Sequence, residues 1–216
     1  AEEFLTTRRS RIRQALDAAL SADFELGDGG VTESIYDAPL LDGRTSLVVS
    51  PSTGRIPRTP VGEDRAGIPS RRMRGIAEGP EDRAMDERCM MGGSLPLRGS
   101  AFPAKIFQTP GHLVIHYEFV NSTIIVPLDD HPPVAAAIRQ WAGTSRGAWD
   151  GDTLVIESTG FDPHWTFQGS GAGLRLVQRL TRIDQDTMHL EYTVHDPESF
   201  TEPWSAAYPL TNTREP

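Results

Sequence analysis

Hydrophobic and polar residues alternate along most of the second half of the chain. This period of two predicts antiparallel strands, because successive side chains of a strand point to opposite faces of a sheet. Alternating or β-branched segments bounded by Pro, Gly, Asn or Asp lie at 45–51, 104–109, 112–120, 122–128, 153–159, 174–183, 187–195 and 203–210. We therefore expect about seven or eight strands at hairpin spacing, without the helices that connect parallel strands.

A helical period occurs in three places. Residues 5–22 predict an amphipathic helix, which Thr6 or Thr7 would cap. Its apolar stripe consists of Ile12, Leu16, Ala19 and Leu20. We also expect a short helix at 133–143, and one or two helical turns within 64–88.

The strand pattern predicts a mainly β protein of one domain, residues 1–216. Residues 1–97 would form a helix- and loop-rich half and residues 98–210 an antiparallel core. A lipocalin-like antiparallel barrel with an N-terminal helix and long loops is the expected fold. A β-sandwich is the alternative, since periodicity does not separate the two.

Composition agrees with this picture and removes some classes of function. Glycine and proline make up about 17% of the chain, above the usual ~12%, which favours turns and long loops. The formal charge of −9 argues against general nucleic-acid binding. No apolar run is long enough to span a bilayer, and the opening AEEFLTTRR has no apolar signal segment. Cys89, the single cysteine, excludes an intrachain disulfide.

Two strands carry a face of histidines and glutamates opposite an apolar face. On 112–120 and 187–195 these polar residues are His112, His116, Glu118, His189, Glu191 and His195. In one interpretation this face is solvated and covers an apolar core. In the other it lines a wet cavity inside a barrel, where His116, Glu118 and Glu191 would transfer protons.

Arginines on the neighbouring segments could stabilise developing negative charge. Arg146 precedes the hairpin turn Asp150-Gly151-Asp152, and Arg179 shares one strand face with Arg175. The alternative for these two strand arginines is cross-strand pairing with Glu191 or Glu157.

Aromatic side chains suggest where an apolar substrate would bind. The candidates are Tyr117, Phe119, Trp149, Phe161 and Trp165. Trp165 lies in a polar, glycine-rich loop, where a large apolar side chain is suited to the mouth of a pocket. Residues 169–173, GSGAG, are interpreted as a flexible lid or turn.

We expect neither a cofactor nor a metal ion. His116 with Glu118, or His164 in FDPHW, are weak metal candidates that need ligands from another element. Phosphate-binding loops, dinucleotide fingerprints and nucleophile elbows have no counterpart in the sequence.

Several blocks, among them IFQTPGHLVIHYEFV, SRGAWDGDTLVIESTGF and LVQRLTRIDQDTMHLEYTVHDPESFTEPW, resemble a large family of uncharacterised bacterial proteins. The resemblance implies export to the periplasm and a shared fold, but it brings no activity. Members usually begin further upstream and continue into a tail with a second cysteine, with which Cys89 would pair.

Three functions fit these observations. The first is a cofactor-independent lyase, isomerase, cyclase or hydrolase that uses His/Glu acid–base chemistry on a small apolar organic molecule. The second is a barrel that only binds or carries such a molecule, and the third is a structural protein of the cell envelope. Whether the chain forms a homo-oligomer is left open.

Overall fold

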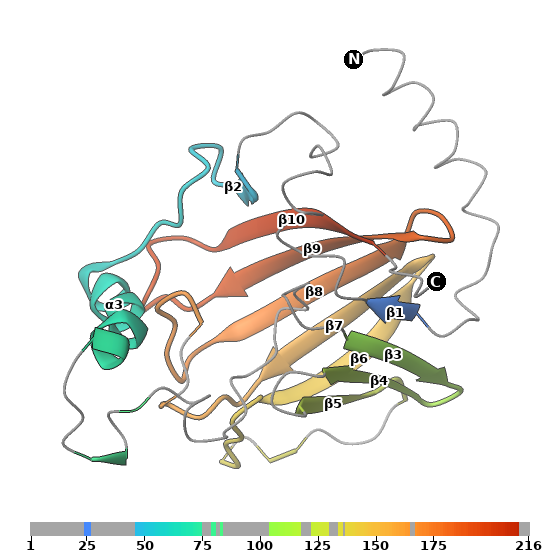
Figure 1. Cartoon of the computed structure of the whole chain (residues 1–216), viewed down its shortest axis with the longest axis horizontal. Helices are drawn as coiled ribbons and strands as arrows, with labels where there is room; N and C mark the ends of the chain where they lie inside the picture. Colours follow the sequence, from blue (N-terminus) through green and yellow to red (C-terminus); the bar gives the residue numbers. More distant parts are fainter. Residues whose placement is uncertain are drawn as a thin grey trace.

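The computed structural model describes residues 24–26, 46–74, 79–80, 83, 104–117, 122–129, 134–135, 137–164 and 167–211. Its strands form two antiparallel sheets (Figure 1). The four-stranded sheet has the order β1 (Phe24–Leu26), β3 (Ala104–Thr109), β4 (His112–Tyr117), β5 (Ser122–Pro127). The six-stranded sheet has the order β2 (Val48–Ser50), β10 (Trp204–Thr211), β9 (Thr187–His195), β8 (Arg175–Arg182), β7 (Thr153–Thr159), β6 (Thr144–Asp150). The prediction of a mainly β, antiparallel protein is confirmed.

The two sheets enclose one apolar core. Ile106, Ile115 and Ile124 occupy one cross-strand row of the four-stranded sheet and are buried. Ile156 and Tyr192 lie in a corresponding row of the six-stranded sheet. The alternation of the sequence therefore decides which face of each strand enters the core.

The six-stranded sheet ends at β6, which packs closely beside β5. A Cβ atom at Gly147 would lie 2.7 Å from Leu128 Cδ2 and 2.9 Å from Val126 Cγ1, so a glycine permits this approach. β5 and β6 are in contact, but the described strands form two separate ladders and do not close into a barrel.

Helix α3 (Pro60–Arg74) is longer than the one or two turns expected within 64–88. Thr59 caps it, since Thr59 Oγ1 accepts the Gly62 N–H at 3.2 Å, and Pro60 is the first helical residue, where no N–H is needed. Among the described residues, no helix is both long and apolar enough to cross a membrane.

The glycine-rich segment 169–173 lies against the start of α3. A Cβ atom at Gly169 would lie 2.2 Å from the Gly62 carbonyl oxygen, and one at Gly62 would lie 2.1 Å from the Ser199 carbonyl oxygen. Residues 169–171 are buried. Of the two interpretations of GSGAG, the structure supports the turn, because packing fixes this segment.

The helix predicted at 133–143 is wrong for the described part of that segment, which is coil and turn. Gln140 instead pairs with the segment after β7, donating its N–H to Gly160 O at 3.0 Å and accepting from the Asp162 N–H at 2.8 Å. Gly143 then turns the chain into β6 with a φ of 67°. The predicted helix 5–22 lies outside the described residues.

Candidate functional site

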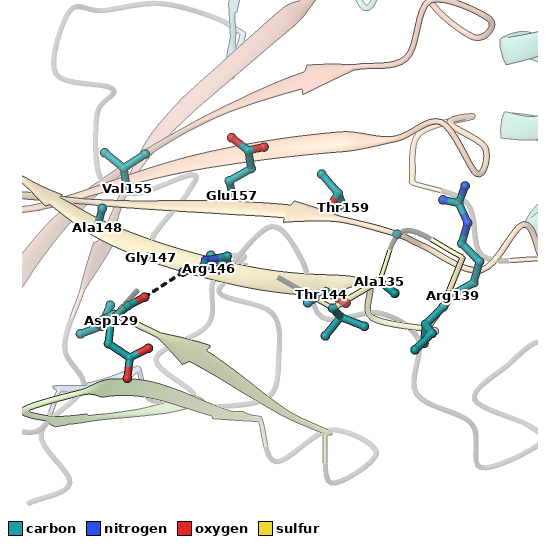
Figure 2. Close-up of a pocket in the computed structure, with 14 residues that line it drawn as sticks. Asp129, Ala135, Arg139, Thr144, Arg146, Gly147, Ala148, Val155, Glu157 and Thr159 are labelled. Atoms are coloured by element: carbon teal, nitrogen blue, oxygen red, sulfur yellow. Dashed lines mark hydrogen bonds between the residues drawn. The ribbon is translucent and has the colours of Figure 1, made fainter. Parts of the chain in front are cut away.

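A cleft of about 620 Å³ lies on the face of β6 and β7 that points away from the core (Figure 2). Its floor is the strand pair, and its wall comes from residues 128–129, 134–135 and 138–139. The lining residues are Leu128, Asp129, Val134, Ala135, Ile138, Arg139, Thr144, Arg146, Gly147, Ala148, Val155, Glu157, Thr159 and Gly160.

Strand alternation explains why polar side chains reach this cleft. Ser145 and Ser158 point into the core, where their hydroxyl groups are buried and bonded at 2.8 Å. Their neighbours on each strand therefore point outward. Arg146 is thereby placed directly opposite Glu157 across the strand pair.

Glu157 is held by Arg175 on the next strand. Arg175 donates from Nε to Oε1 at 3.0 Å and from Nη2 to Oε2 at 2.6 Å. This hydrogen bonding lowers the pKa of the Glu157 carboxyl and raises the pKa of the Arg175 guanidinium. Glu157 is thus an ionised carboxylate with both oxygens engaged, and the cross-strand pairing considered for Arg175 is confirmed.

His195 extends this polar group along the outer face, since it pairs in register with Arg175. Partial burial lowers the pKa of the His195 imidazole, and the positive charge of Arg175 lowers it further. The imidazole is therefore neutral near pH 7.

Arg146, expected to stabilise negative charge, does line the cleft. Its Nη2 donates to the Asp129 carbonyl oxygen at 2.8 Å, an interaction that joins β6 to the cleft wall (Figure 2). Arg139 lies at the other end of the cleft, beyond Thr144 and Ala135, as Figure 2 shows. Arg139 Nη1 donates to the Ala172 carbonyl oxygen at 3.0 Å.

Apolar side chains of the wall are unusually exposed. Val134 is 41% exposed and Ile138 is 53% exposed, and both line the cleft. Hydrocarbon beside charged groups in a concave surface is typical of sites for small organic molecules.

The other predicted catalytic residues are not brought together. His116 lies on the outer face of the four-stranded sheet, where its Nδ1 is 2.9 Å from Thr123 Oγ1. Glu191 lies on the outer face of the six-stranded sheet, in register with Arg179. The Arg179 Nη2 donates to Asp150 Oδ2 at 2.7 Å, so its carboxylate partner differs from the two considered, Glu157 and Glu191. Glu118 lies outside the described residues.

The buried face of β4 and β9 is the apolar one. Leu113 and Ile115 on β4, and Leu190 and Val194 on β9, are buried. His116 therefore lies on the face of β4 that points away from the core. This agrees with the first of the two interpretations, in which the polar face is solvated. The alternation that fills the core with aliphatic side chains sends the histidines and glutamates outward.

The predicted substrate contacts have different positions. Tyr117 and Phe161 are buried in the core, and packing accounts for both. Trp149 is partly exposed beside the hairpin turn. Phe119 and Trp165 lie outside the described residues.

Among the residues that the structure describes, no three His, Cys, Asp or Glu side chains are grouped to hold a metal ion. His164 instead bonds locally to Asp162, through its backbone N–H at 2.8 Å and its Nδ1 at 2.9 Å. The backbone hydrogen bond from His164 lowers the pKa of the Asp162 carboxyl.

Sequence reasoning missed Arg139, Val134 and Ile138 as site residues. They lie in the segment that was expected to be helical. The pairing of Gln140 with Phe161, a contact between distant residues, places them at the cleft.

Comparison with known proteins returned no match, whether to a family model, to a curated protein or to a solved structure.

Proposed function

We propose that this protein binds a small organic molecule in the cleft beside β6 and β7. One observation carries the proposal: a cleft of about 620 Å³ in which the exposed side chains of Val134 and Ile138 lie beside Arg139. This volume falls within the range typical of small-molecule sites, roughly 300–1,000 Å³. Exposed aliphatic residues gain most from a ligand that covers them.

The charged groups of the cleft support binding over acid–base chemistry. Glu157 is ionised and both of its oxygens accept hydrogen bonds from Arg175, so it is poorly placed to take a proton from a ligand. The Arg146 guanidinium is tied to the cleft wall through the Asp129 carbonyl. Groups fixed in this way orient a ligand without moving protons.

The strand order favours a lipocalin-like fold for this binding protein, with the cleft on the outer face of the larger sheet and not in a barrel interior. β3, β4 and β5 follow one another in the smaller sheet, and β6 to β10 follow one another in the larger sheet. Such an up-and-down succession is typical of lipocalin-like barrels. We propose that the two sheets are the two parts of one barrel-like meander, opened between β5 and β6.

An enzyme is the second candidate, favoured by the position of His195. Its neutral imidazole lies in register with Arg175, the partner of the cleft residue Glu157. His195 is not one of the lining residues, so a ligand would have to extend from the cleft past Arg175 for this neutral imidazole to accept a proton from it. NMR of bound compounds over hours, with the wild type and with His195→Gln, tests this candidate: conversion that depends on His195 supports it, and unchanged compounds contradict it.

Export to the periplasm is also a proposal. It depends on the resemblance of the sequence blocks to an exported bacterial family.

The binding proposal is tested by filling the cleft. Ala148 is exposed on the floor of the cleft, so Ala148→Phe adds a ring there without entering the core. Thr187→Phe adds the same ring to the outer face of β9, away from the cleft residues. A library of small apolar compounds is screened by thermal shift and ligand-observed NMR. We expect compounds that bind the wild type and Thr187→Phe but not Ala148→Phe; equal binding to all three proteins would contradict the proposal.

A further inference from the structure

Within the part of the chain that the structure describes, Arg139 lines the cleft and has no carboxylate partner. Four other arginines of the described residues are paired with carboxylates: Arg58 with Glu63, Arg65 with Glu198, Arg175 with Glu157, and Arg179 with Asp150. The hydrogen bond of Arg139 is to a backbone carbonyl, that of Ala172. Arg182 likewise bonds to backbone carbonyls, those of Asp184 and Gln185, so Arg139 is distinguished by its place in the cleft.

The guanidinium of Arg139 retains most of its hydrogen-bonding capacity. A guanidinium has five N–H donors and stays protonated at all physiological pH values. The bond to Ala172 O uses one donor and fixes the side chain at its end of the cleft. The planar fork of the remaining donors matches the two oxygens of a carboxylate.

The other charges of the cleft limit the charge of the ligand. Asp129 and Glu157 line the same cleft, and Glu157 is neutralised by Arg175 behind it. A phosphate dianion would be repelled by these carboxylates. A group with a single negative charge fits this balance better.

The apolar part of a ligand would contact two exposed aliphatic side chains of the cleft. Ile138 precedes Arg139 in the chain, and its side chain, like that of Val134, is exposed in the cleft. A molecule whose charged end reaches Arg139 would therefore lay an apolar body against these two residues.

From this arrangement we infer that the ligand is a monocarboxylate with an apolar body, and that Arg139 binds its carboxylate. The inference rests on the proposed function, since it names the class of molecule that the same cleft takes. The inference predicts that the protein prefers acids over neutral molecules with the same body, whereas the binding proposal by itself predicts no such preference.

Three probes with one body separate charge from hydrocarbon: 4-phenylbutyrate, 4-phenylbutan-1-ol and 4-phenylbutylamine. Their dissociation constants are measured by calorimetry on the full chain. We expect 4-phenylbutyrate to bind about tenfold or more tightly than the alcohol, the size expected for one charge-assisted hydrogen-bonded pair, and the amine to bind most weakly.

Variants of Arg139 assign this selectivity to one side chain. Arg139→Gln should reduce binding of 4-phenylbutyrate to the level of the alcohol and leave the alcohol unchanged. Arg139→Lys keeps the charge without the planar fork and should lose only part of the preference. Arg55→Gln, at an exposed arginine next to β2 and thus near the opposite edge of the larger sheet, is the matched control and should change nothing.

The outcomes distinguish the two proposals. Equal binding of the acid and the alcohol, blocked in both cases by Ala148→Phe, would overturn the carboxylate inference and leave the binding function standing. A preference for the acid that survives Arg139→Gln would also overturn the inference. Absence of binding by all three probes, or binding that Ala148→Phe does not affect, would overturn both.

Discussion

Asp196 lies where α3, the turn at 169–173 and the segment after β9 meet, and its replacement is expected to weaken all three. The side chain is buried, and it accepts three hydrogen bonds. Oδ2 accepts from the Gly171 N–H at 2.7 Å and from Ser199 Oγ at 2.9 Å, and Oδ1 accepts from the Glu198 N–H at 3.2 Å. Arg65 then donates to Ser199 Oγ at 2.9 Å and links the cluster to α3.

The expected cost follows from the donors that each substitution leaves without an acceptor. In Asp196→Ala the buried Gly171 N–H loses its acceptor, and the Ser199 hydroxyl loses a partner too. An unsatisfied buried donor costs about 1–3 kcal/mol, so we expect a loss of roughly 3 kcal/mol in the free energy of unfolding. Asp196→Asn can keep an oxygen at the Oδ2 position and gives up only the longest bond, so its loss should be about 1 kcal/mol.

Urea unfolding followed by tryptophan fluorescence measures these losses, and thermal unfolding by circular dichroism provides a second reading. For a chain of this size, roughly 3 kcal/mol corresponds to a decrease of about 6–12 °C in Tm. Glu202→Ala, at an exposed position, is the control and should stay within about 0.5 kcal/mol. A loss below about 1 kcal/mol for Asp196→Ala, or equal losses for the two Asp196 variants, would show that the carboxylate does not stabilise the fold through these buried donors.

Three further predictions concern packing and charge. Gly62→Ala should destabilise the protein by about 1–3 kcal/mol, because its methyl group would meet the backbone oxygen of Ser199; unchanged urea unfolding would contradict this close packing. Glu157→Gln should cost at most about 1 kcal/mol, since the ion pair with Arg175 is half-exposed, and 1 M NaCl should shrink the difference from wild type in the same unfolding assay. Because the pKa of His195 is lowered in the folded state, protonation favours unfolding, so stability should fall as the pH drops below about 6.5. His195→Gln should flatten the dependence of Tm on pH between pH 7 and 5.5. The pKa of Glu157 is also lowered in the folded state, so the stability lost through protonation of Glu157 should appear only below about pH 4.5.

Local patterns predicted the strands well. β7 and β9 have the bounds expected from alternation alone, because the side chains of one strand decide which of its faces enters the core. The turn at Asp150-Gly151-Asp152 was equally readable, since Gly151 has a φ of 61°, which favours glycine. Pairing of Arg175 with Glu157 was one of two alternatives, and the register of β7 with β8 brings them close enough to meet.

The cleft could not be predicted from local sequence patterns. Its wall includes Val134, Ile138 and Arg139, in a segment whose composition suits a helix, but the backbone of Gln140 bonds to Gly160 and Asp162 instead. Arg146 was a candidate from its position before the hairpin, but its neighbours in the cleft come from a contact across 21 residues, between Gln140 and Phe161. His116 and Glu191 looked like a possible pair because both strands alternate in the same way; the strands lie in different sheets.

The claim that a small molecule binds beside β6 and β7 is tested most directly by an NMR titration of the backbone amides with 4-phenylbutyrate. We expect saturable shift changes that concentrate at Gly147, Ala148 and Gly160 in the cleft and spare Gly62 in α3. Shift changes that concentrate in the core, at residues such as Ile115 and Leu190, or no saturable change at the cleft residues, would contradict it.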